Sequence, residues 1–145
     1  MKDFILIITI TALFSLNACG QDNKIVPKEV TSAFSQKFPN ASKVKWSMEN
    51  NKEWEAEFKI DNKKYSANFD IKGVWLETEY KINKNEIPAS VKTTLQKEFK
   101  GYKIEESEIS ETALGKVYEF ELEKGESELE VAIDLNGKVV KKEKN

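Results

Sequence analysis

An internal duplication constrains the fold of this chain more than any other feature of its sequence. The segment VPKEVTSAFSQKF matches a later segment, IPASVKTTLQKEF, in its proline and in its spaced apolar positions. Two further pairs of segments align in the same order. Two copies of one unit therefore fill residues 26–143. Each copy has roughly 60 residues, a length that is marginal for a domain standing alone. The aligned pairs are 26–38 with 87–99, 54–60 with 118–124, and 65–75 with 129–139.

Each unit begins with a helix signal. Pro27 and Pro88 stand where a first helical turn would begin, where the missing N–H of proline does no harm. The apolar residues of the first segment recur at the spacing of one helical face. Pro39 ends the first helix, and Gly101 follows the second. The pattern predicts helices within 26–38 and 87–99.

After the helix, each unit changes to strict alternation of apolar and polar residues. In the second unit, residues 118–122 place apolar side chains on one face and glutamates on the other. This period of two predicts antiparallel strands with one solvated face. Hairpin turns are predicted at Asp61-Asn62, Lys124-Gly125 and Asn136-Gly137, and the last of these indicates type I′. Residues 109–115 interrupt the alignment and read as a loop insertion.

We therefore predict an α+β fold built as a tandem repeat. Each unit would be one helix followed by about four antiparallel strands, with the helix packed on one face of the sheet. The first unit would span residues 26–86 and the second 87–145. We expect the two units to pack together, and whether one sheet continues into the other stays open.

The N-terminus predicts export from the cytoplasm. Lys2 is followed by an apolar run, 4–16, that is too short to span a membrane comfortably. Leu16-Asn17-Ala18-Cys19 then resembles the bacterial lipobox. That resemblance implies a signal peptide over 1–18, a lipidated Cys19 and a tether over 19–25, which would place the protein at a membrane surface. The alternative is an ordinary secretory signal followed by a spectator cysteine.

Composition excludes several classes of function. The chain has no histidine and no arginine, and Cys19 is its single cysteine. No Ser-His-Asp or Cys-His arrangement can form, and no thiolate or imidazole cage for zinc. The net charge of −2 offers no general attraction to nucleic acid. We expect no enzyme activity, no cofactor, no metal site and no nucleic-acid partner.

Two short motifs carry a resemblance to a known family. Residues 70–74 (DIKGV) and 134–138 (DLNGK) resemble the Asp-x-x-Gly hairpin of PepSY-type domains. The helix-first order behind a lipobox resembles PepSY-like lipoproteins, over about residues 26–143. The resemblance implies a fold similar to the β-lactamase inhibitor protein and a role in binding or restraining peptidases or other envelope proteins. It assigns no catalytic residue.

Two sets of side chains are candidates for binding a partner. Trp46, Trp54 and Trp75 all lie in the first unit, either as an aromatic binding patch or as core residues on the covered face. The pattern does not decide whether Trp75 points toward the covered face. A ladder of glutamates on one predicted sheet face is either a docking surface for a basic partner or Ca²⁺, or a solvated face that protects against aggregation. It comprises Glu119, Glu121, Glu123, Glu128 and Glu130.

These observations favour a non-catalytic lipoprotein of the cell envelope. It would be lipid-anchored, periplasmic or surface-exposed, and it would bind an unknown envelope protein or peptide, with peptidase inhibition as one form of that role. Trp75 and the five glutamates are the candidate partner-binding residues. The alternative hypothesis is a lipoprotein that senses or scavenges a small ligand or a metal ion.

Overall fold

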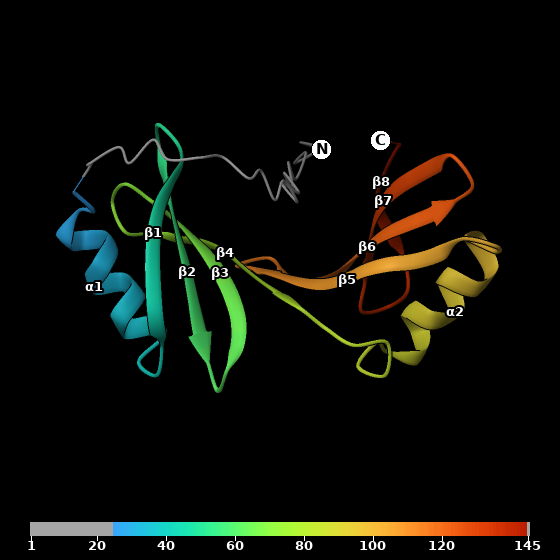
Figure 1. Ribbon diagram of the computed structural model, residues 1–145, viewed down its shortest axis with the longest axis horizontal. Helices are drawn as coiled ribbons and strands as arrows, with labels where there is room; N and C mark the ends of the chain where they lie inside the picture. Colours follow the sequence, from blue (N-terminus) through green and yellow to red (C-terminus); the bar gives the residue numbers. More distant parts are fainter. Residues whose placement is uncertain (1–24, 145) are drawn as a thin grey trace.

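A computed structural model describes residues 25–144 of the chain, which form one antiparallel sheet and two helices (Figure 1). The eight strands pair in the order in which they occur along the chain. The elements are α1 (Lys28–Lys37), β1 (Ser42–Asn50), β2 (Glu53–Ile60), β3 (Lys63–Asp70), β4 (Trp75–Lys81), α2 (Ala89–Glu98), β5 (Lys103–Thr112), β6 (Gly115–Lys124), β7 (Ser127–Asp134) and β8 (Val139–Lys144).

The predicted fold class, a tandem repeat of a helix and about four strands, is wrong. The strands form a single eight-stranded sheet because β4 and β5 pair directly. Tyr80 lies opposite Ile109, and Glu77 lies opposite Thr112. The segment 109–115, which we interpreted as a loop insertion, is largely strand and supplies these partners. The hydrogen bonds between β4 and β5 leave neither half of the sheet with a free edge at this position.

The strands at this junction lack the pattern that identifies a half-buried strand. Thr78 of β4, and Ser107 and Glu111 of β5, hold positions on the helix-covered face where the outer strands carry apolar or small residues. Without apolar alternation the sequence signal for pairing is weak. The join between the halves therefore escapes a prediction based on hydrophobic periodicity.

Both helices pack on the same face of the sheet. Phe34 of α1 contacts Phe58 of β2 edge-on, with ring centroids 5.0 Å apart, and also packs against Trp46 and Phe69. The face continues across the junction, where the rings of Tyr65 and Tyr80 lie 5.1 Å apart. It then carries the second core, in which α2 covers β5–β7. Figure 1 shows the helices at opposite ends of the long axis. The second core comprises Ile87, Val91, Leu95, Phe99, Ile109, Tyr118, Phe120, Leu122, Leu129, Val131 and Ile133.

The Asp-x-x-Gly hairpins fix the helices to the sheet. The Asp70 carboxylate accepts hydrogen bonds from the backbone N–H groups of Lys72 and Val74, each at 2.8 Å, and Asp134 makes the equivalent contacts at 2.9 Å. Gly73 has φ +83° and lies directly against the α1 backbone at Glu29. These loops therefore need glycine both for the turn and for the close approach.

The predicted hairpin turns at Asp61-Asn62 and Asn136-Gly137 differ in backbone conformation. Asp61 and Asn62 both have positive φ, at 49° and 65°, as a type I′ turn requires. In Asn136-Gly137 only the glycine has positive φ, at +85°, so the type I′ assignment is wrong there. The Asp134 carboxylate instead accepts hydrogen bonds from the backbone N–H groups of Asn136 and Lys138, which stabilises a loop longer than a two-residue turn.

Replacing Gly73 by alanine should destabilise the protein strongly. An added Cβ would lie 2.6 Å from the Glu29 carbonyl oxygen, and the residue would keep an unfavourable positive φ. We expect a loss of about 2–4 kcal/mol in the free energy of unfolding, measured by chemical denaturation. The control is Gly125→Ala, where φ is also positive but no atom lies within 4 Å of the added Cβ. Equal losses at both positions would contradict the packing account.

Candidate functional site

The face of the sheet opposite the helices is lined with glutamates from six strands. Strand register assigns it, because successive side chains point to opposite faces and the apolar set faces the helices. We call this surface the acidic face. Its glutamates from β2 and β4–β8 are Glu53, Glu55, Glu57, Glu77, Glu79, Glu106, Glu108, Glu119, Glu121, Glu123, Glu128, Glu130 and Glu143.

The five glutamates predicted from the sequence all lie on the acidic face. Register places Glu121 opposite Glu130, and Glu123 opposite Glu128. Glu119 lies opposite Ala132 and is buried, with 4% of its surface exposed. Like charges directly opposite each other on neighbouring strands destabilise a sheet. Glu121 with Glu130 and Glu123 with Glu128 therefore form two facing pairs of carboxylates that repel each other.

The sequence analysis missed the central members of this surface. Glu77 and Glu79 of β4 and Glu108 of β5 join Glu119 of β6 around Ser110, which is fully buried. The Ser110 hydroxyl donates a hydrogen bond to Glu77, and Glu79 lies opposite Ser110 in the register. Recognising this group needs the pairing of β4 with β5, and the sequence gives no clear signal of that pairing.

The central carboxylates hold their protons unusually tightly. Loss of solvent raises the pKa of Glu79 from 4.5 to about 8, and neighbouring carboxylates, Glu77 first among them, add to the effect. Burial likewise raises the pKa of Glu119 to about 8, with Glu77 contributing and Lys141 opposing. Burial also raises the pKa values of Glu55, Glu77 and Glu108. At neutral pH the centre of this face is a cluster of partly protonated acids.

The cations nearest to the central carboxylates form ion pairs with other glutamates of the acidic face. Neither carboxylate oxygen of Glu119 has a hydrogen-bond partner, although the side chain is buried. Lys141 pairs with Glu130 at 3.7 Å and with Glu143 at 3.1 Å. Lys81 pairs with Glu106. A buried carboxylate without a partner loses hydration and gains nothing in return.

Trp75 lies apart from the glutamates, on the face that the helices cover. Its indole N–H donates to the Thr78 hydroxyl at 2.9 Å, and the Lys37 ammonium lies 3.5 Å from its ring centroid. It packs against the first core, as Trp46 does, while Trp54 is a buried member of that core. The core interpretation is therefore confirmed for Trp54, and the structure does not bring Trp75 together with the predicted glutamates.

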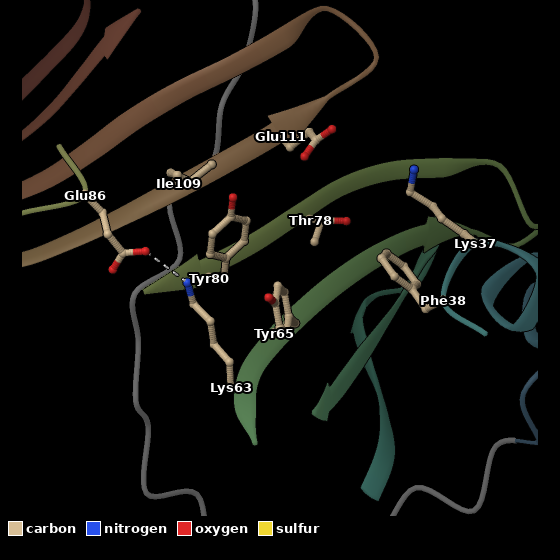
Figure 2. A pocket seen from close by; sticks show the side chains of 9 residues that line it. All are labelled: Lys37, Phe38, Lys63, Tyr65, Thr78, Tyr80, Glu86, Ile109 and Glu111. Atoms are coloured by element: carbon tan, nitrogen blue, oxygen red, sulfur yellow. Dashed lines mark ion pairs between the residues drawn. The ribbon is translucent and has the colours of Figure 1, made fainter. Parts of the chain in front are cut away.

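A concave feature lies on the helix-covered face, between the two cores. It is a hollow of about 520 Å³ at the junction of β3, β4 and β5 (Figure 2). Figure 2 shows the aromatic rings of Phe38, Tyr65 and Tyr80 among the side chains that line it. Lys63 lies at its edge, 3.7 Å from Glu86 and 4.5 Å from the centroid of the Tyr80 ring. We call this hollow the aromatic groove.

Several further predictions concern ions, membranes and the anchor. Within residues 25–144, no group of three or more cysteine or acidic side chains is arranged to hold a metal ion. No helix in this same range is long and apolar enough to cross a membrane. Cys19, with the predicted signal peptide and most of the tether, lies outside the described residues.

The chain belongs to a known family. A family model described as "Putative beta-lactamase-inhibitor-like, PepSY-like" matches residues 20–63 and 52–141. These matches span most of the chain and confirm the resemblance seen in the Asp-x-x-Gly hairpins. No curated protein matches the chain in a sequence search.

Solved structures share the fold at low sequence identity. A BLIP-like protein from Bacteroides fragilis superposes with a TM-score of 0.76 at 19% identity, covering 85% of this chain and 89% of that one. A DUF2874 family protein from Bacteroides uniformis gives 0.76 at 16% identity, covering 83% and 90%. A protein from Bacteroides eggerthii, titled "putative periplasmic proteins", gives 0.75 at 16%, covering 83% and 90%.

Stability should fall as pH rises through the neutral range. A carboxyl whose pKa is raised on folding binds its proton more tightly in the folded state than in the unfolded state. The free energy of unfolding therefore decreases from about pH 4.5 to about pH 8. Glu119→Gln and Glu79→Gln cannot ionise, so each should raise stability at pH 8 by about 1–2 kcal/mol and flatten the profile. Denaturant unfolding at several pH values measures this.

Glu98→Gln is the matched control for this experiment. Glu98 is exposed at the end of α2, away from the acidic face, so its loss should leave the pH profile unchanged. A wild-type stability that stays constant between pH 5 and pH 8 would contradict the assignment. So would an equal response of all three variants.

Proposed function

We propose that this protein is a non-catalytic envelope lipoprotein that binds a protein partner through the acidic face. The observation that carries the proposal is the buried carboxylate of Glu119 at the centre of this face, whose two oxygens have no hydrogen-bond partner. Natural proteins satisfy buried polar groups, and exceptions point to a strained or functional surface. A basic partner surface would supply the missing donors and relieve the repulsion between facing glutamates.

The shape of the protein supports this use of the sheet. The helices cover one face, so within the described residues the opposite face is a broad surface from one edge strand to the other. Its rigid backbone holds the glutamates at fixed spacings, which favours recognition of a defined pattern of charge. The family description, with its reference to an inhibitor of β-lactamase, supports a protein partner and a role that restrains it.

The proposed location follows from the N-terminus. The lipobox-like segment ending at Cys19 supports lipid attachment and display at a membrane surface outside the cytoplasm. A structure of the same fold is titled as periplasmic, which agrees with this location. The tether of 19–25 would keep the sheet within reach of proteins at that surface.

The aromatic groove supports a second candidate function, which is the binding of a small ligand. Its volume of about 520 Å³ is in the range of ligand-binding sites, and it combines aromatic walls with charged groups at the rim. A planar or apolar small molecule is the chemistry that this lining would take. Thermal stabilisation that is lost in Tyr80→Ala would support this candidate.

The principal test is crosslinking in living cells followed by capture from detergent-solubilised envelope. Wild type, Cys19→Ala, the double variant Glu79→Gln/Glu119→Gln and the control Glu98→Gln would be compared. We expect wild type and Glu98→Gln to capture the same protein. The double variant should capture at least about tenfold less of that protein than wild type does, because it removes two charged contacts. Cys19→Ala should lose the partner by leaving the membrane.

Two results would contradict the proposed function. One is the absence of any protein specific to the lipidated form. The other is a partner captured equally by wild type and by the double variant, which would show that recognition occurs on another surface.

A further inference from the structure

The centre of the acidic face has the features of a socket for one cationic side chain. Ser110 forms its floor and is fully buried. Glu79 of β4 lies opposite Ser110, and Glu77 accepts a hydrogen bond from the Ser110 hydroxyl. Glu119 of β6 lies opposite Glu108, the next residue of β5 on this face. These carboxylates therefore surround a small, buried residue on the acidic face.

We propose that this group, Glu77, Glu79 and Glu119 around Ser110, binds a lysine or arginine side chain of the partner protein. The inference rests on the proposed function and deepens it, because it names the chemistry of the contact. The carboxylate of Glu119 is the independent observation that points to a ligand. Only 4% of the surface of this residue is exposed, yet neither carboxylate oxygen has a hydrogen-bond partner.

The geometry favours an organic cation over a metal ion. No three acidic side chains in residues 25–144 come close enough together to hold a metal. The carboxylates sit on β4 and β6, with β5 between them, and neighbouring strands lie about 4.8 Å apart. An ammonium or guanidinium group, with three or five N–H donors, can reach carboxylates at such separations.

Charged groups around the socket determine its response to pH. Glu55 lies two strands from Glu79, Glu108 adjoins both central carboxylates, and Lys141 adjoins Glu119. An incoming cation favours the ionised carboxylates, so binding must expel protons that are held near neutral pH. The groups facing Glu79 and Glu119 from the surrounding strands are Glu55, Lys64, Glu77, Lys81, Glu106, Glu108, Glu121, Glu130 and Lys141.

The experiment titrates a defined probe into the full chain in non-ionic detergent. The probe is an acetylated, amidated pentalysine peptide, and its fully side-chain-acetylated form is the negative control. Calorimetry at pH 7 in two buffers of different ionisation enthalpy measures the protons exchanged on binding. We expect proton release with the lysine peptide, tighter binding at pH 8 than at pH 6, and no binding of the acetylated form.

Single variants then locate the contact. Glu119→Gln should weaken binding by about tenfold and reduce the proton release, since one charged contact and one titrating group are lost. Glu79→Gln provides a second variant if Glu119→Gln folds poorly. Glu98→Gln should behave as wild type in both affinity and proton release.

Three outcomes would overturn the socket. Binding without proton release would place the peptide on the exposed glutamates alone. Equal affinity of the peptide for wild type and for both socket variants would also place it on the exposed glutamates. Displacement of the peptide by equimolar CaCl₂ would show that the site takes a metal ion. Because the probe is a peptide, the socket can stand if cell crosslinking finds no partner, and it can fail while a partner is captured elsewhere.

Discussion

The pairing of β4 with β5 is the constraint on which the rest of this structure depends. It joins two cores, each formed by one helix and the strands beneath it, into one eight-stranded sheet. The pairing also brings Glu77 and Glu79 beside Ser110 and Glu108, and so next to Glu119 on β6. The same hydrogen bonds that complete the fold therefore assemble the centre of the acidic face.

Assembling that centre opposes folding. Facing carboxylates repel, and the buried Glu119 gives up hydration without a hydrogen bond in return. The two apolar cores offset this loss, because hydrophobic burial on the helix-covered face is the dominant favourable term. The protein thus keeps a destabilised surface on a scaffold stabilised elsewhere, a distribution that is common where a binding site needs unsatisfied groups.

Hydrophobic periodicity predicts the parts of the fold that bury apolar side chains. It locates both helices, the strands around Trp54 and Phe120, and the glutamates of β6 and β7. It fails at β4 and at the end of β5, where Thr78 and Glu111 replace the apolar side chains that mark the covered face of a strand. The ladder glutamates, Glu119 among them, were therefore predictable, whereas the positions of Glu77, Glu79 and Glu108 beside Glu119 follow only from the three-dimensional pairing. Cys19 stays a prediction, since it lies outside the described residues.

The most direct test of this account is an NMR titration of the glutamate side-chain carboxyl carbons in the full chain. It reports the protonation of each carboxyl separately, without any partner or probe. The account predicts that Glu79 and Glu119 titrate near pH 8, far above the 4.5 of an ordinary glutamate. Titration of both residues near pH 4.5 would show that the central carboxylates are solvated or already paired, and would contradict the account.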